Sequence, residues 1–257
     1  MTTAARHLHT LLEQVENGEG PSISKRWEAV LEAPPFSTAF ALRHTAVMSL
    51  WHETIGVIQS LPQTPTRDRR LAYADAWWRA IVMPEAHWGD GQRHQLIDQA
   101  ALDGLDFAAE FLEQLDGGSQ PEPPAGALDA LRIQAEEWIV RIQATDGLSR
   151  GLTASLLDHL NNLIWCIENA DRFGAAPVVA AAERATGGLL RTALGTMQPA
   201  WGQHLAKFVA AVTLIATGLT QTNLAIDQGQ DLYREIAAAA HHQPDPDLPQ
   251  PPETEIN

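Results

Sequence analysis

Apolar residues recur at intervals of seven between residues 199 and 241, and this repeat constrains the fold more than any other feature of the sequence. Its positions, which we call the C-terminal seam, are Leu205, Phe208, Val212, Ile215, Leu219 and Ile226. The residues between them are mostly small or weakly polar, with almost no charge before Asp227. Such a stripe is typical of a helix whose apolar face is covered by other helices. We therefore expect one long helix over 199–241, buried against helices of the same chain or of another chain.

The rest of the sequence shows the apolar spacing of helices, and no run has the period-two alternation of a strand. Helices are predicted at about 3–16, 24–31, 38–61, 66–83, 91–115, 128–142, 150–173 and 177–194. Residues suited to capping their first turns are Ser24, Ser37 or Thr38, Asp90, and Ser149 or Thr153. The expected fold class is all-α, a helical bundle that ends in a long helix.

Two segments have the composition of linkers or tails. Residues 117–124 are rich in Gly and Pro, so we place a domain boundary there, between a helical bundle at 1–116 and a second bundle at 125–241. Residues 242–257 combine Pro with Asp and Glu, a composition typical of disordered segments. We expect this acidic, proline-rich tail to be disordered.

The charge balance restricts the class of partner. The chain has 32 acidic and 17 basic residues, a net charge of −15. Contacts to nucleic-acid phosphates come from Lys and Arg, and the one basic cluster, Arg67, Arg69 and Arg70, is interrupted by Asp68. A nucleic-acid partner is therefore not expected. A basic protein partner fits the acidic balance, and a homo-oligomer is a further possibility left open by the C-terminal seam.

Cysteine content and hydropathy bear on the compartment. Cys166 is the single cysteine, so an intrachain disulfide is excluded, which fits a reducing cytosol. Residues 1–9 lack the apolar core of a signal peptide. The longest weakly polar stretch, 208–220, is shorter than a membrane span requires. A cytoplasmic protein is expected.

The second half of the chain resembles a known kind of module. Between Ser149 and Ile226 the sequence runs through LLDHLNNLIWCIENADRFG, APVVAAAERATGGLL and HLAKFVAAVTLIATGL. This order is similar to a helical module at the end of uncharacterised bacterial proteins, some of them in phage-defence or toxin-related settings. The resemblance implies an all-α bacterial protein. It implies no catalytic residues and no cofactor.

One polar group of residues has metal-ligating chemistry: Glu85, His87, Asp90, His94 and Asp98. In the predicted helix, His94 and Asp98 are four positions apart and share a face, which would let imidazole and carboxylate bind a divalent metal with His87. The spacing matches no established zinc or di-iron motif. The alternative interpretation makes Asp90 a helix cap and His94 and Asp98 a solvent-facing pair.

Cysteine and tryptophan offer two further candidates. His159 precedes Cys166 by seven residues, about 10 Å along a helix, too far to deprotonate the thiol, so a buried structural thiol is expected. Trp77 and Trp78 are adjacent and point about 100° apart on a helix. Both can be buried only by a wide interface, so one of them is predicted to meet a partner or to line a groove.

Three functions remain open on these observations. The first, which we favour, is a non-enzymatic interaction protein: a scaffold, a regulator or an immunity-like factor. The second is a membrane-acting effector that inserts the weakly polar segment 203–226, although Lys207, Gln221 and Asn223 raise the cost of insertion. The third is a helical metal-dependent enzyme built around His87 and His94.

Overall fold

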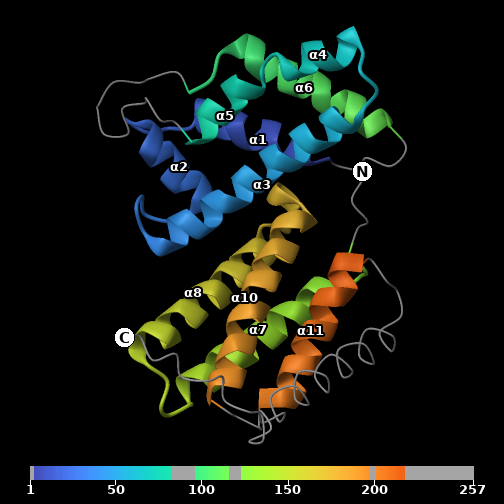
Figure 1. Cartoon of the computed structure of the whole chain (residues 1–257). Coiled ribbons are helices and arrows are strands. Elements are labelled where there is room, and N and C mark those ends of the chain that lie inside the picture. The colour runs from blue at the N-terminus through green and yellow to red at the C-terminus, as the bar shows by residue number, and fades with distance from the viewer. Residues whose placement is uncertain (1–2, 83–95, 116–122, 197–200, 218–257) are drawn as a thin grey trace, which may run out of the picture.

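The computed structural model describes residues 3–82, 96–115, 123–196 and 201–217, and within these ranges every regular element is a helix (Figure 1). The first half of the chain forms α1 (Ala4–Asn17), α2 (Ile23–Leu31), α3 (Thr38–Ser60), α4 (Pro65–Leu71), α5 (Ala74–Val82) and α6 (Gln99–Gln114). The second half forms α7 (Ala127–Gln143), α8 (Arg150–Glu168), α9 (Ala170–Phe173), α10 (Ala175–Thr196) and α11 (Gly202–Thr217). The predicted all-α helical bundle is confirmed.

Side-chain caps start most of the helices. Ser37 and Ser149, two of the predicted caps, accept backbone hydrogen bonds from Phe40 and Leu152 at the starts of α3 and α8. The prediction for α2 was wrong by two residues, because the hydroxyl of Ser22, not Ser24, accepts the bond from the first turn. Each cap satisfies a backbone donor that has no partner inside the helix.

Two other predicted helices have different boundaries. The helix predicted at 66–83 is two helices, α4 and α5, with a break after Leu71. At the break the ring of Tyr73 lies on α6, so close that a Cβ at Gly104 would come within 2.6 Å of the ring atom Cδ2. The helix predicted from 91 instead begins at Gln99, because Asp98 is its cap and residues 96–98 are not helical.

The N-terminal half is built around α1. This helix packs against α6, α3 and α2, and its side of the core contains Leu8, Leu11 and Leu12, all fully buried. Its last carbonyls, those of Val15 and Glu16, accept hydrogen bonds from the buried guanidinium of Arg26 on α2. Helices end with unpaired carbonyls, so this arginine both closes α1 and holds α2 against it.

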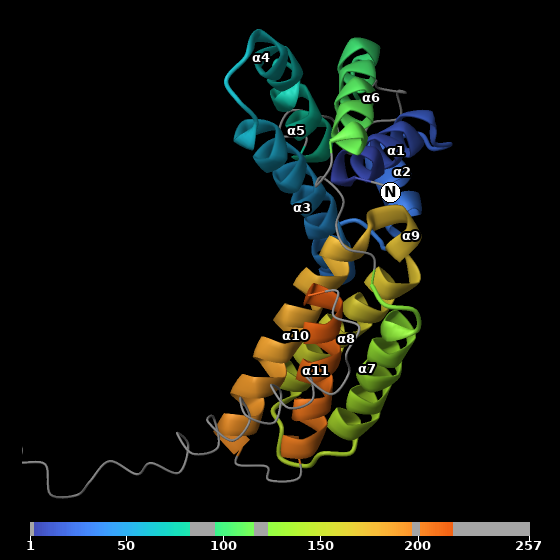
Figure 2. The same cartoon turned by 90° about the vertical axis from the view of Figure 1, so that its right-hand side faces the viewer.

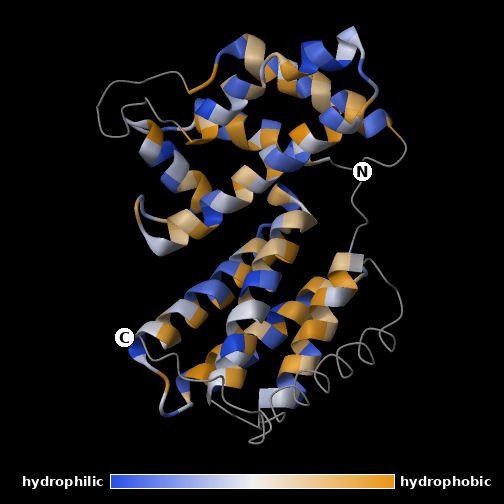
Figure 3. Cartoon of the chain, in the orientation of Figure 1, coloured by the Kyte–Doolittle hydropathy of each residue, from blue (hydrophilic) through white to orange (hydrophobic). Residues whose placement is uncertain are grey.

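The C-terminal half is a four-helix arrangement. Figure 2 shows α7, α8, α10 and α11 running alongside one another, and the contacts close a ring in which each helix touches two neighbours. Apolar residues recur along each of these helices (Figure 3), and the buried ones belong to the shared core. At the start of α11, the ring of Trp201 meets that of Trp138 edge-on at 5.1 Å between centroids.

The two halves share one continuous apolar core. Helix α3 contacts α8 and α10, and α1 contacts α9, so the N-terminal half rests on one end of the C-terminal bundle (Figures 1 and 2). The predicted boundary at 117–124 lies between α6 and α7, although its residues 117–122, like the predicted tail at 242–257, are outside the described ranges. No helix in the described part of the chain is long and apolar enough to cross a membrane.

Candidate functional site

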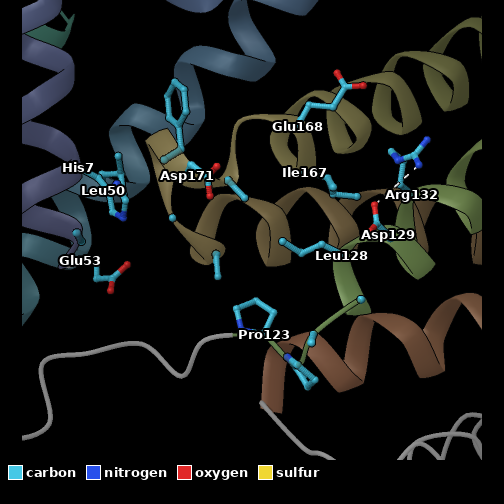
Figure 4. A pocket seen from close by; sticks show the side chains of 18 residues that line it. His7, Leu50, Glu53, Pro123, Leu128, Asp129, Arg132, Ile167, Glu168 and Asp171 are labelled. Carbon is cyan, nitrogen blue, oxygen red and sulfur yellow. Dashed lines mark ion pairs between the residues drawn. The ribbon is translucent and has the colours of Figure 1, made fainter. Parts of the chain in front are cut away.

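A groove of about 650 Å³ lies where the two halves meet. Helices α1 and α3 supply one wall, and α7, α8, α9 and the first residue of α10 supply the other (Figure 4). The segment Pro123–Gly126, which leads into α7, closes one side. A hollow of this size is in the range of sites that bind small molecules or peptide segments.

The groove has an apolar base. Leu50 of α3, Ile167 of α8 and Phe173 of α9 are buried residues of the shared core whose side chains line it, together with the half-buried Leu128 of α7. Phe173 is held edge-on against Trp165, with 5.0 Å between the ring centroids. The apolar base therefore belongs to the rigid core of the protein.

Four carboxylates belong to the same lining. Glu53, Asp129, Glu168 and Asp171 line the groove, each from a different helix. Among the described residues that line the groove, Arg132 is the one arginine, and its charge is matched because it lies 3.8 Å from Asp129 and 2.7 Å from Glu136. The net charge of the lining is therefore negative, and the groove attracts cationic groups.

His7 adds little positive charge to the groove near neutral pH. Its Nδ1 lies 3.0 Å from the carbonyl oxygen of Arg172, and burial is the main cause that lowers the pKa of its imidazole. The ring packs over Gly174, where a Cβ would come within 3.1 Å of it. Gly174 has φ +76°, a conformation in which glycine is favoured, so this residue ends α9 and makes room for His7.

A polar network fixes α9, which carries Asp171 and Phe173, against the N-terminal half. The indole Nε1–H of Trp165 donates to Glu32 at 3.0 Å, and Arg172 lies 3.7 Å from the same carboxylate. Arg172 also donates to the carbonyl of Val30 at 3.2 Å. These bonds join the end of α2 to α8 and α9, so they attach one wall of the groove to the N-terminal half.

Of the five residues of the predicted metal site, the structure describes Asp98. Asp98 is the cap of α6, where its carboxylate accepts a hydrogen bond from the backbone N–H of Ala100 at 3.1 Å. His87 and His94, with Glu85 and Asp90, lie outside the described residues. Among the residues that are described, no group of three or more His, Cys, Asp or Glu side chains could hold a metal ion.

The residues predicted to meet a partner are mostly core residues of this chain. The seam residues Leu205, Phe208, Val212 and Ile215 are buried in the four-helix arrangement, against helices of the same chain. Leu219 and Ile226 lie outside the described residues.

The two adjacent tryptophans, Trp77 and Trp78, differ in burial. Trp77 is fully buried, and its Nε1–H donates to the carbonyl of Ala101 at 2.7 Å. Trp78 is half-buried and rests on Trp51, with 4.8 Å between the ring centroids. A partner therefore has access to Trp78 but not to Trp77.

The predicted role of Cys166 is confirmed. Its side chain is buried on α8, and burial raises the pKa of the thiol to about 12. A thiol in this state is a packing group and not a nucleophile.

The groove carboxylates were not singled out by the sequence. Glu53, Asp129, Glu168 and Asp171 are separated by up to 76 residues between neighbours in sequence and follow no common motif. The one signal that pointed toward them is the net charge of −15, which predicts a basic partner without locating its site.

Comparisons with family models, with curated proteins and with solved structures give no match for this chain. The similarity of residues 149–226 to a module of bacterial proteins therefore stays a prediction from the sequence. The groove, and not a relative, is the basis for a functional proposal.

Proposed function

We propose that this protein is a non-enzymatic interaction protein whose acidic groove binds a basic segment of a protein partner. The observation that carries the proposal is the groove itself, whose lining combines four carboxylates with half-buried apolar residues such as Leu128, Ala170 and Ala175. A peptide segment that alternates apolar residues with Lys or Arg has the matching chemistry. Apolar contacts would supply affinity, and the charges would speed association and select the partner.

The setting of this interaction is also part of the proposal. A reducing cytoplasm fits a chain whose one cysteine is a buried free thiol. The similarity of residues 149–226 to bacterial modules supports a scaffold, regulator or immunity-like factor of a bacterial cell, in a defence or toxin-related system.

Binding of short basic peptides tests the proposal. Fluorescence anisotropy would be measured with labelled peptides that place Lys or Arg at alternating or helical spacing among apolar residues, and with acidic peptides of the same length. We expect saturable binding of basic peptides that weakens with added salt. Glu168→Gln and Asp129→Asn are expected to weaken it about three- to tenfold each, the usual effect of a charge at an interface rim.

Matched controls separate the groove from general attraction by an acidic surface. Asp103→Asn on α6 and Asp146→Asn after α7 remove one exposed carboxylate each and do not line the groove. These controls should leave binding within about twofold of the unaltered protein, well under the rim effect. Equal weakening by groove and control variants, or no saturable binding of any basic peptide, would contradict the proposal.

A further inference from the structure

Aromatic side chains gather on the outer face of α6, in the N-terminal half of the protein. Phe107 is 67% exposed and lies on the side of the helix opposite its buried residues. The ring of Tyr73, a residue that is 38% exposed, rests on Gly104, and the half-buried Phe111 is one turn along the same face. We call Tyr73, Phe107 and Phe111 the aromatic patch. Contiguous exposed apolar surface of this kind marks a site of interaction.

Positive charge lies at one edge of the aromatic patch. The guanidinium of Arg70 on α4 stacks on the ring of Phe111, with 3.7 Å between its Cζ and the ring centroid. Arg67 on the same helix lies 3.4 Å from Asp68, but Arg70 has no carboxylate partner among the residues that the structure describes. Its Nε is also buried without an acceptor in that part of the chain. A carboxylate brought by a partner would match the charge of Arg70.

Negative charge lies at the opposite edge. Asp103 and Glu110 are exposed, four residues before and three residues after Phe107. Helical spacing places both on the side of α6 that faces α1, the side where Arg6 of α1 pairs with Glu113 at 3.1 Å. Neither Asp103 nor Glu110 forms an ion pair within the described ranges. Figure 2 shows the same order, with α4 and α5 on one side of α6 and α1 on the other.

The two charged edges match each other under a two-fold rotation. Arg70 lies over Phe111, four residues after Phe107, whereas Asp103 lies four residues before Phe107 on the other edge. A two-fold axis that passes through Phe107, perpendicular to the surface, exchanges the two edges and reverses the direction of α6. It therefore brings Arg70 of one copy to Asp103 of a second copy, and the reverse pair forms at the same time.

The same rotation pairs the other side chains of this surface. Tyr73 rests on Gly104, three residues before Phe107, and Glu110 lies three residues after it on the acidic edge. The rotation brings the phenol of Tyr73 to Glu110 of the second copy, so its hydroxyl can donate a hydrogen bond to that carboxylate. Phe107 meets its own counterpart at the axis. The surface is therefore complementary to itself, whereas a partner with charges of one sign would leave one edge unmatched.

We propose that two copies of this protein form a two-fold dimer through the aromatic patch, with their α6 helices antiparallel. An apolar centre with a charged rim is the usual anatomy of a protein–protein interface. Neither the patch nor its charged edges include a residue that lines the groove, so each copy of the dimer keeps its own groove. Dimerisation and the binding of basic peptides are therefore measured independently.

Sedimentation velocity of the full chain between about 1 µM and about 500 µM tests the proposal, because this range covers weak association through a small interface. The net charge of −15 on each copy opposes association, so about 0.15 M salt is used, which screens charges more than about 8 Å apart. We expect a monomer–dimer equilibrium. Phe107→Asp places two like charges at the axis and should abolish the dimer. Val140→Asp on α7 is the matched control, since Val140 is 66% exposed and outside the patch, and its dimer should be as strong as that of the unaltered protein.

Two charge variants test the two-fold geometry itself. Arg70→Glu and Asp103→Lys each bring like charges together at both pairs, so each should weaken the dimer at least about tenfold. In an equimolar mixture, one copy of each variant restores opposite charges at both pairs, so the mixture should dimerise about as strongly as the unaltered protein. Circular dichroism checks that each variant keeps its thermal midpoint. If Arg70→Glu loses its fold, Phe107→Asp and Asp103→Lys, at exposed positions, still decide the question.

Three results would overturn the proposal, whatever the outcome for basic peptides at the groove. The first is a protein that stays monomeric at every concentration, which would leave the aromatic patch to a different partner. The second is equal weakening by Val140→Asp and Phe107→Asp. The third is a mixture of the two charge variants that associates no more strongly than either variant alone.

Discussion

The indole of Trp165 on α8 donates its hydrogen bond to Glu32, the residue that ends α2, across a distance of 3.0 Å and 133 positions of sequence. Glu32 has φ 51°, an uncommon conformation for a residue with a side chain, and its carboxylate also faces Arg172. The guanidinium of Arg43 stacks on the Trp165 ring at 4.6 Å and donates to the carbonyls of Leu31 and Glu32. The joint between the halves is therefore polar as well as apolar.

Trp165→Phe should destabilise the protein through this joint. The phenyl ring keeps much of the apolar contact with Phe173 but removes the donor to Glu32, so a loss of about 1–2 kcal/mol in the free energy of unfolding is expected. Urea denaturation followed by circular dichroism measures it. Trp78→Phe, at a half-buried tryptophan away from the joint, is the control. An equal loss in both variants would show that the bond to Glu32 contributes nothing particular.

Gly174→Ala should disturb both the end of α9 and the position of His7. The alanine would have to adopt a positive φ of +76°, which side chains disfavour, and its methyl group would lie 3.1 Å from the His7 ring. A destabilisation of about 1–3 kcal/mol is therefore expected. Gly147→Ala isolates the backbone contribution, because Gly147 has φ +87° and open space around it. Thermal unfolding of both variants gives the comparison. If Gly147→Ala lowered the stability as much as Gly174→Ala, the contact with His7 would contribute nothing to the loss.

Stability should fall as the pH drops below the ordinary histidine pKa of 6.5. Burial is the main cause that lowers the pKa of His44, while its bond to the carbonyl of Ile81 opposes the change. At a pH between the lowered pKa of folded His44 and 6.5, the unfolded chain holds more protons than the folded chain. The contribution of His44 to stability is therefore complete above pH 6.5 and is lost as the pH falls through the pKa of the folded state. His7, His159 and His204 are shifted in the same direction.

Urea denaturation between about pH 7.5 and 5, above the carboxylate range, measures this dependence. His44→Gln keeps a donor for Ile81 but does not titrate, so its stability should depend less steeply on pH. His52→Gln, at an exposed position of the same helix, should retain the original slope. An unchanged slope in His44→Gln would contradict the assignment.

Cys166 should resist thiol reagents in the folded protein. Its side chain is 1% exposed and burial raises its pKa to about 12, so neither access nor ionisation favours reaction. Reaction with an aromatic disulfide reagent should follow global unfolding, with the free energy of unfolding as its barrier. Rapid labelling under native conditions would show that this part of α8 opens locally.

Helix spacing was sufficient to predict most of the helices, because apolar periodicity reflects the same burial that the fold achieves. The seam from Leu205 to Ile215 was correctly expected to be covered by helices, but periodicity does not distinguish helices of the same chain from those of another. For the same reason the sequence did not show which of Trp77 and Trp78 belongs to the core, and the structure buries Trp77. A large apolar side chain has the same pattern in both settings.

The boundaries that were predicted wrongly depend on tertiary contacts. Ser22 and Ser24 are equally good caps in isolation. With Ser22 as the cap, the first turn of α2 includes Ile23, whose side chain is buried in the core. The break before Tyr73 depends on the contact of its ring with Gly104, thirty-one residues later. The groove is least visible in sequence, because its carboxylates lie on four different helices and only the tertiary fold brings these helices together.

The walls of the groove include residues as far apart in the sequence as Ala4 and Ala175, which belong to different halves of the chain. An occupant of the groove would therefore contact the beginning and the second half of the polypeptide at the same time. Its binding would stabilise the folded state of the entire chain and so raise the melting temperature, and a chain that lacks either wall would lose this stabilisation.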